Sequence, residues 1–372
     1  MKSKKMLFLP ILAIVILVGV LVIMSSCSSD DDDITYSIIS SDNVTDDGLK
    51  YSVYENNTIV ITGRTKEDTT INIPSEIDGK KVVEIGERAF ESDATVVIVT
   101  IGENVTRIGA DAFNSCPKLA MVEAPKKLKK INSAAFYNCE RLAEFKGAEN
   151  LVFIGESAFF ECGSLTYFNF PETLTTIENE AFSGCRKLTE VVLPEKIENL
   201  GEYVFSFCTS LTRITLNDGL KTIPAGTFYN CPYLESVVIS SSVKSINEHA
   251  FRGAKNLKDI YLPKSLKVIG EVAFAQCPLL QNIYYEGSQS DYEKIDIDIS
   301  NDSFYPKEEE TTTEEIVEET LEEDTSEDVY DDEEIYDDED IYDDEDIYED
   351  EFFEEETEAP ELEIFYNQKF NK

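Results

Sequence analysis

The chain has no tryptophan and a single histidine, His249, among its 372 residues. Any serine, cysteine or metal chemistry that uses an imidazole would therefore depend on that one side chain. No glycine follows Gly287, so a calcium-binding EF-hand loop is excluded from the C-terminal region. No glycine-rich phosphate-binding loop is present either. These absences argue against an enzyme, and we predict no catalytic residues, no metal site and no cofactor.

Positive charge is also scarce, with 32 Lys and Arg against 75 Asp and Glu and a net charge of −43. Residues 307–372 alone carry a net charge of −30. Such a segment repels nucleic acid phosphates, which argues against nucleic acid as a partner. We predict that residues 307–372 form an acidic disordered tail. Two alternatives stay open for this tail: a polyanionic segment that docks on a partner, and loose capture of divalent cations.

The N-terminus has the layout of an export signal. A basic start precedes an uncharged apolar stretch from Met6 to Met24, and small residues then lead to Cys27. This resembles a bacterial lipoprotein signal, in which the cysteine becomes the lipidated first residue. We predict a signal peptide over residues 1–26, lipid attachment at Cys27 and a disordered spacer over residues 27–48. The alternative is that Met6 to Met24 remains as a transmembrane anchor.

Phenylalanine recurs at one constant spacing through the middle of the chain, without an insertion. Ile or Leu lies five positions before each Phe, and a pair of apolar residues lies nine and eleven positions after it. Two apolar residues around one variable residue predict a short strand, and a unit this small can bury its apolar side only by stacking on its neighbours. The nine positions are Phe90, Phe113, Phe136, Phe159, Phe182, Phe205, Phe228, Phe251 and Phe274.

We therefore predict an α/β-type repeat solenoid of the leucine-rich repeat kind over residues 49–306. Its 23-residue coils would place their strands in one parallel β-sheet, with ten strands between Ile71 and Tyr285. Apolar alternation on both sides of residues 55–58 predicts an N-terminal β-hairpin cap. Glycines that follow the Ile of several coils, such as Gly109 and Gly155, are expected to ease tight turn angles.

Seven of the eight cysteines follow the same period and lie three positions after a repeat Phe. Equivalent positions in a stack are too far apart for disulfides. Ala254 occupies this position in one coil and Asp93 in another. The substitution by alanine indicates a small apolar site, so we predict a column of buried free thiols.

The consensus Ile-Gly-Glu-x-Ala-Phe-x-x-Cys-x-x-Leu-x-x-Ile-x-Leu-Pro resembles the BspA-like leucine-rich repeat proteins of bacteria. The ending Tyr284-Tyr285-Glu286-Gly287 also fits that family. The resemblance implies a cell-surface protein, often a lipoprotein, in a family with adhesive and host-protein-binding members. We expect a monomeric, lipid-anchored protein on the extracellular face of the bacterial membrane or on the outer-membrane surface, with a protein or glycan ligand. A structural or spacer role in the cell envelope, without a specific ligand, is the alternative.

The residues on either side of the first inward apolar residue of each strand point outward and form one ribbon. From this ribbon we select aromatic, charged and hydrogen-bonding side chains as candidate ligand contacts. The alternative is that these residues only suit a solvent-facing strand. The candidates are Tyr167, Asn169, Glu190, Arg213, Thr215, Asp259, Tyr261 and Tyr284.

Overall fold

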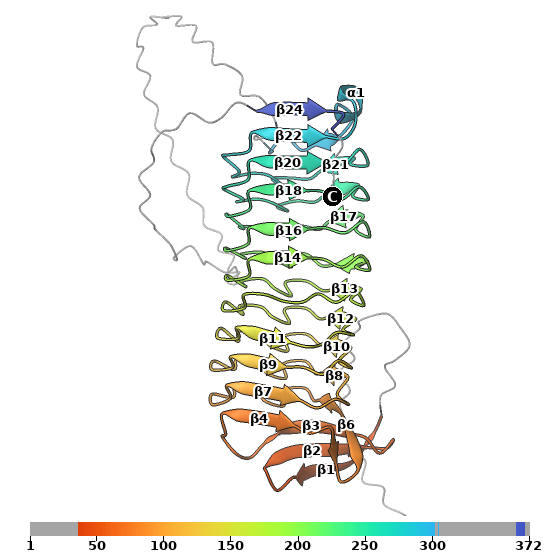
Figure 1. Cartoon of the computed structure of the whole chain (residues 1–372), viewed down its shortest axis with the longest axis vertical. Coiled ribbons are helices and arrows are strands. Elements are labelled where there is room, and N and C mark those ends of the chain that lie inside the picture. The colour runs from red at the N-terminus through yellow and green to blue at the C-terminus, as the bar shows by residue number, and fades with distance from the viewer. Residues whose placement is uncertain (1–35, 302–303, 305–361, 369–372) are drawn as a thin grey trace, which may run out of the picture. The chain divides into compact units, whose positions relative to one another are not determined.

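The computed structural model describes residues 36–301, 304 and 362–368. The predicted signal peptide, Cys27 and residues 305–361 of the acidic region lie outside the described residues. From Ile38 onward the chain forms one compact unit, in which successive coils stack on one another (Figure 1). Among the described helices, none combines the length and apolarity that crossing a membrane requires.

One side of the stack is a ladder of parallel strands, which we call the long-strand ladder. Between Ile98 and Tyr285, partner residues in paired strands are 23 positions apart, as in the pairs Val99 with Val122 and Ile260 with Ile283. The predicted parallel strands are confirmed for nine of the ten, but the ladder is broken after Lys146 and after Thr215 rather than being one continuous sheet. Its strands are β4 (Thr70–Ile73), β7 (Ile98–Ile101), β9 (Met121–Glu123), β11 (Glu144–Lys146), β14 (Glu190–Val192), β16 (Arg213–Thr215), β18 (Ser236–Val238), β20 (Asp259–Leu262), β22 (Asn282–Tyr285) and β24 (Glu363–Tyr366).

A second parallel ladder, the short-strand ladder, runs along another side of the stack. The sequence analysis predicts only the first ladder. It forms because the Ile or Leu five positions before each Phe packs against the core, buried in every coil but that of Leu200, and its backbone pairs with a neighbouring coil, as Ile108 does with Ile131. Among the described residues helix is almost absent, because each coil turns within a few residues. The strands are β6 (Lys80–Ile85), β8 (Arg107–Ile108), β10 (Lys130–Ile131), β12 (Phe153–Ile154), β13 (Thr176–Ile177), β15 (Asn199–Leu200), β17 (Thr222–Ile223), β19 (Ser245–Ile246), β21 (Val268–Ile269) and β23 (Asp296–Ile297).

The repeat phenylalanines form a continuous stack through the core. From Phe113 to Phe274 each ring is fully buried. Adjacent rings are stacked, with centroids 5.1–5.8 Å apart, from the Phe90–Phe113 pair to the Phe251–Phe274 pair. The core is therefore one column of interlocking side chains rather than a set of separate clusters, as the fixed period predicts.

The predicted column of buried free thiols is confirmed. All seven repeat cysteines are free and buried. Each Sγ lies 3.1–3.4 Å from the backbone carbonyl oxygen of the repeat Phe in the preceding coil, as Cys116 does from Phe90 and Cys231 from Phe205. A thiol donates weakly, and here it satisfies a buried carbonyl lone pair of that coil.

Each coil turns at two residues with left-handed backbone angles, located two positions before and two positions after the repeat Phe. The φ angles at these positions lie between +45° and +80°, and most of the residues are not glycine. The predicted role of Gly109 and Gly155 is wrong, because neither has a positive φ. A Cβ atom at either position would instead lie 2.6 Å from a backbone nitrogen of the preceding coil, so glycine there permits close stacking.

The N-terminal cap is an antiparallel meander. The predicted hairpin is confirmed as β2 (Leu49–Tyr54) paired with β3 (Ile59–Arg64), and β5 (Glu76–Ile77) pairs with β6 beyond it. The prediction of a disordered spacer over residues 27–48 is wrong for its last part, because β1 (Ile38–Val44) pairs with β2. This strand buries almost none of its side chains, so it has no apolar alternation by which to predict it.

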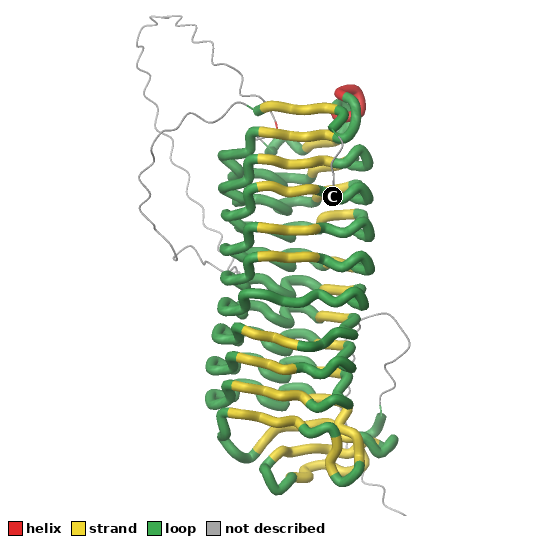
Figure 2. Tube along the Cα trace, in the orientation of Figure 1, coloured by secondary structure: helices red, strands yellow, loops and turns green. Residues whose placement is uncertain are grey.

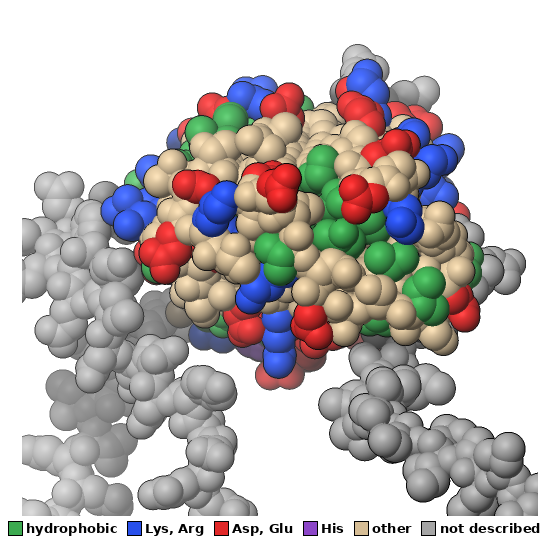
Figure 3. All heavy atoms as spheres, turned by 90° about the horizontal axis from the view of Figure 1, so that it is seen from below, with side chains coloured by type: hydrophobic (Ala, Val, Ile, Leu, Met, Phe, Trp, Pro, Cys, Tyr) green, Lys and Arg blue, Asp and Glu red, His purple; other side chains and the backbone are tan. Residues whose placement is uncertain are grey.

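Seen from below, the N-terminal end of the stack shows mixed charge and a group of exposed hydrophobic side chains (Figure 3). Strand β1 contributes Ile38, Ile39 and Val44, which are each about half exposed or more.

At the other end the chain forms β22, the short helix α1 (Gln289–Tyr292) and β23. The long-strand ladder then receives β24 from the far end of the sequence (Figure 1). Residues 362–368 are therefore part of the folded unit, and the boundary predicted for a tail over residues 307–372 is wrong for this segment. The sequence pattern does not reveal β24, because residues 305–361 separate this strand from Phe304 and its position does not follow the 23-residue period.

Candidate ligand-binding face

The outward-facing residues of the long-strand ladder form the candidate site, which we call the ladder face. All eight predicted ligand contacts lie on it and are exposed or half-buried, while the apolar residues between them are buried. The strand alternation that was used to predict outward positions is therefore correct for every one of them. Their contacts divide them into three groups along the stack.

The first group is Tyr167 with Asn169. Tyr167 is 59% exposed, and Phe168 between the two is buried. The predicted strand does not form here, and Figure 2 shows loop rather than strand on the side of the long-strand ladder between β11 and β14. Two inward rings, Phe168 and Phe170, occupy the positions that Val191 and Leu193 hold in the next coil, and they pack on Phe182.

The second group is Glu190, Arg213 and Thr215 on the adjacent strands β14 and β16. Glu190 and Arg213 are partners in the register, and the Arg213 Nη1 atom lies 3.3 Å from Glu190 Oε1. The arginine side chain is 74% exposed, so this ion pair contributes at most about 1 kcal/mol to stability. The guanidinium thus remains accessible to a ligand.

The third group is Asp259, Tyr261 and Tyr284 on β20 and β22. The rings of Tyr261 and Tyr284 are stacked with centroids 4.5 Å apart. The column continues into Phe365 of β24, whose ring centroid lies 5.0 Å from that of Tyr284. In the other direction Val238, which is 43% exposed, is the register partner of Tyr261. We call Tyr261, Tyr284 and Phe365 the aromatic column of the ladder face, and Val238 lies next to its first member.

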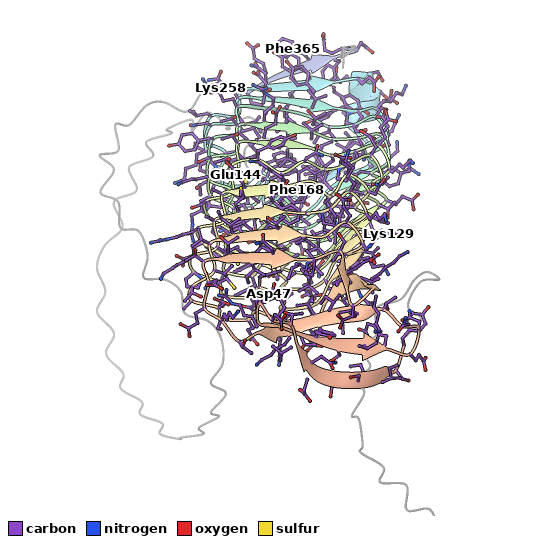
Figure 4. All side chains as sticks on the ribbon, turned by 60° about the horizontal axis from the view of Figure 1, so that its bottom comes forward. Asp47, Lys129, Glu144, Phe168, Lys258 and Phe365 are labelled. Atoms are coloured by element: carbon purple, nitrogen blue, oxygen red, sulfur yellow. The ribbon has the colours of Figure 1, made fainter. Side chains whose placement is uncertain are left out.

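Phe365 is the site residue that sequence reasoning missed, and Figure 4 marks it at the C-terminal end of the stack, well beyond Glu144 and Phe168. A signal for it is present in the sequence. Glu363-Ile364-Phe365-Tyr366 repeats the polar–Ile–aromatic–Tyr order of Asn282-Ile283-Tyr284-Tyr285. The two segments pair residue by residue in the structure.

A polar column runs beside the aromatic one. Asp259 is the register partner of both Ser236 and Asn282, and the Asn282 amide Nδ2 donates a hydrogen bond of 2.7 Å to Asp259 Oδ1. Partial burial, together with Tyr284 and Asp259 nearby, raises the pKa of Tyr261 above its ordinary value. The C-terminal half of the face therefore offers neutral hydroxyl, amide and ring edges with a few carboxylates, and it does not suit an anionic ligand.

The stacking also limits how a ligand can meet the rings. Because Tyr261, Tyr284 and Phe365 cover one another's faces along the stack, their edges point toward solvent. A ligand lying across the strands would contact ring edges and phenol oxygens of successive coils. Such a surface is extended and repetitive, and it fits a ligand that spans several coils better than a small molecule in a pocket.

His249 lies on a turn away from the ladder face, as the variable residues at its repeat position predict. Its ring packs edge-on against Tyr229, with centroids 6.1 Å apart, and its Nδ1 lies 3.4 Å from Arg252 Nη1. Arg252 also lies over the Tyr229 ring. Within residues 36–301, 304 and 362–368, no group of three or more His, Cys, Asp or Glu side chains is arranged to hold a metal ion.

The stacked coils, the parallel strand ladder and the buried Phe and Cys columns define a solenoid of the leucine-rich repeat class. The chain matches the family described as BspA type leucine rich repeat region, in six copies over residues 66–189 and 175–305. It belongs to that family, and the resemblance found in its motifs is confirmed. No curated protein sequence matches the chain.

Several solved structures are similar to it. A leucine-rich repeat protein from Bacteroides ovatus is 24% identical over 68% of this chain and 67% of its own, with a TM-score of 0.52, which supports the fold. A leucine-rich repeat protein from T. pallidum is 26% identical over 64% and 90% of the two chains, with a TM-score of 0.39. A leucine rich cell surface protein from Faecalibacterium prausnitzii is 23% identical over 68% and 97%, with a TM-score of 0.33.

Proposed function

We propose that this protein is a non-enzymatic binding protein that recognises a protein or glycan ligand with its ladder face. The observation that carries the proposal is the aromatic column, in which Tyr261, Tyr284 and Phe365 are lined up beside hydrogen-bonding side chains. Tyrosine and other aromatic residues on an accessible face are frequent binding anchors. Arg213 and Tyr167 extend the same face toward the middle of the stack.

Binding of the purified protein to a glycan array and to a panel of extracellular-matrix proteins tests this function. Once a ligand is found, Tyr261→Ser combined with Tyr284→Ser should weaken its affinity by roughly thirtyfold or more, the effect of losing about 2 kcal/mol at an anchor. Tyr233→Ser is the matched control, because Tyr233 is 56% exposed and lies outside the ladder face. Undiminished binding by the double variant, or an equal loss in the control, would exclude this face.

We further propose that the protein is attached to the outer side of a bacterial membrane through a lipid on Cys27 and acts as a monomer. The basic and apolar N-terminal sequence before that cysteine supports this. Labelled palmitate should be incorporated into the chain and should be absent from a Cys27→Ala variant. Absence of label from both chains would leave Met6 to Met24 as the anchor, and equal labelling of both would exclude Cys27 as the attachment site.

The alternative function is a structural or spacer protein of the cell envelope. The long, regular stack favours it, because a solenoid of this kind holds its two ends apart without any ligand. A deletion strain with altered envelope integrity, together with no ligand on either panel, would support this alternative over binding.

A further inference from the structure

The C-terminal edge of β22 is completed by a strand that does not follow it in the chain. In the last part of the long-strand ladder, β18 and β20 are each paired with the strand of the next coil. After β22 the chain contributes α1 and β23, and β23 extends only the short-strand ladder. The edge of β22 is instead covered by β24, which enters after residues 305–361.

Strand β24 binds this edge through backbone hydrogen bonds. The Glu363 N–H donates to the Gln281 carbonyl at 2.7 Å, and the Asn367 N–H donates to the Gly287 carbonyl at 2.9 Å. A third bond, of 3.2 Å, joins the Gln368 N–H to the Tyr285 carbonyl. These are main-chain contacts, so they do not depend on the identity of the docked side chains.

The side chains of β24 supply the specificity. Ile364 and Tyr366 point inward and pack against the core, and the Tyr366 ring lies 5.9 Å from the ring of Tyr292. Phe365 points outward and stacks on Tyr284. All three are only half-buried, whereas their partners Ile283 and Tyr285 in β22 are almost fully buried. The strand is therefore held on one side only.

The connection to β24 weakens its hold further. Residues 305–361 contain 32 acidic residues and one basic residue, and charge runs of one sign repel themselves. A connection of this length also gives the strand a low effective concentration at its site, in the millimolar range or below. A free segment with the same side-chain pattern can therefore compete with it.

We propose that the edge of β22 is a strand-addition site for an extended peptide with the order polar–Ile–aromatic–Tyr, and that β24 is its exchangeable resident. The peptide adds in parallel, with Ile over Ile283 and Tyr over Tyr285. Exchange of β24 would replace Phe365 in the aromatic column by the aromatic residue of the peptide, but the exchange needs no ladder-face ligand to operate.

The test uses a labelled synthetic peptide with the sequence of residues 361–372 and a chain that ends at Pro360. Fluorescence anisotropy should show saturable binding of the peptide to the shortened chain and at least tenfold weaker binding to the full chain. A peptide carrying Ile364→Asp should bind neither, because it would place a charge over Ile283. Absence of binding by a shortened chain that retains the circular dichroism of the full chain would overturn the proposal.

Hydrogen exchange in the unaltered full chain gives a second measurement that does not require the shortened chain to fold. The amides of Glu363 and Asn367 should exchange at least a hundredfold faster than those of β20, because β24 leaves its site without unfolding the stack. Equal protection of β24 and β20 would show that the strand does not exchange, and it would overturn the proposal independently of any peptide.

Discussion

Asp93 occupies, in the first coil, the position that cysteine or alanine holds in the other eight coils. Its carboxylate receives hydrogen bonds from the Arg64 guanidinium at 2.6 and 2.7 Å and from the backbone N–H groups of Thr95 and Val96. The side chains of Arg64 and Asp93 are only 9% and 13% exposed. Where the stack begins, a buried ion pair between the cap and the first coil thus replaces the thiol column.

Replacing Asp93 by alanine should lower the free energy of unfolding by about 3–5 kcal/mol, because it leaves the Arg64 guanidinium buried without its carboxylate. Urea unfolding followed by circular dichroism measures this change. The double variant Arg64→Met with Asp93→Ala should recover much of the loss, since no unpaired charge then remains. As a control, Glu149→Ala removes the exposed partner of Lys126 and should cost less than about 1 kcal/mol. A similar cost for Asp93→Ala would contradict the role of the buried pair.

The same pair has a defined pH dependence. Burial raises the pKa of Asp93, but the hydrogen bonds from Arg64, Thr95 and Val96 outweigh it and leave the pKa below its usual value. A carboxyl group with a lowered pKa in the folded state stabilises above its unfolded pKa, about 3.9, and loses this contribution as the pH falls further. The stability difference between the natural chain and Asp93→Ala should therefore shrink below about pH 4.

At the scale of the strands, prediction from sequence succeeded where a side-chain pattern repeats, except in the coil of Phe168, where the long strand does not form. The inward and outward positions of Tyr261 and Tyr284 followed from a period of two within the strand and 23 along the chain. The pattern could not reveal β1, which is paired through its backbone and buries almost no side chain. It also missed β24, because the order that Glu363–Tyr366 shares with β22 is recognisable only when segments far apart are compared.

The interruption of the short-strand ladder was equally open to prediction. At the residue after the Ile or Leu of this ladder, the backbone N–H donates to the preceding coil, as Gly201 does to Ile177 and Asn247 to Ile223. Pro224 occupies this position in the coil between them and has no N–H to donate to Leu200. The ladder is divided between β15 and β17 at this point. A proline within a strand pattern thus marks the boundary between two parts of the sheet.

At the scale of the whole molecule, the cysteine that recurs in seven coils forms a column of buried thiols along the stack. Burial raises the pKa of the thiols of Cys162, Cys185, Cys208 and Cys231, the last to about 12. The pKa of Cys139 is also raised, chiefly by its contact with Cys116 and by burial. The thiolate form is thus disfavoured along most of the column, and these thiols stay protonated while the stack is intact.

This column predicts alkaline instability. A thiol whose pKa is raised by folding stabilises fully below its unfolded pKa of about 8.5, and the contribution is lost as the pH rises toward the folded value. The free energy of unfolding should therefore fall between about pH 8.5 and 12, by up to about 1.4 kcal/mol per pH unit for each such thiol. Cys162→Ala should reduce the slope of the unfolding free energy against pH by the contribution of one thiol. Below pH 8 it should change the unfolding free energy little, because Ala254 already occupies the same position in another coil. Urea unfolding of both chains under reducing conditions at pH 7.5, 9 and 10 measures the difference. Cys162 is fully buried. Identical pH profiles of the two chains would mean that its thiolate is tolerated inside the stack, and they would contradict the prediction.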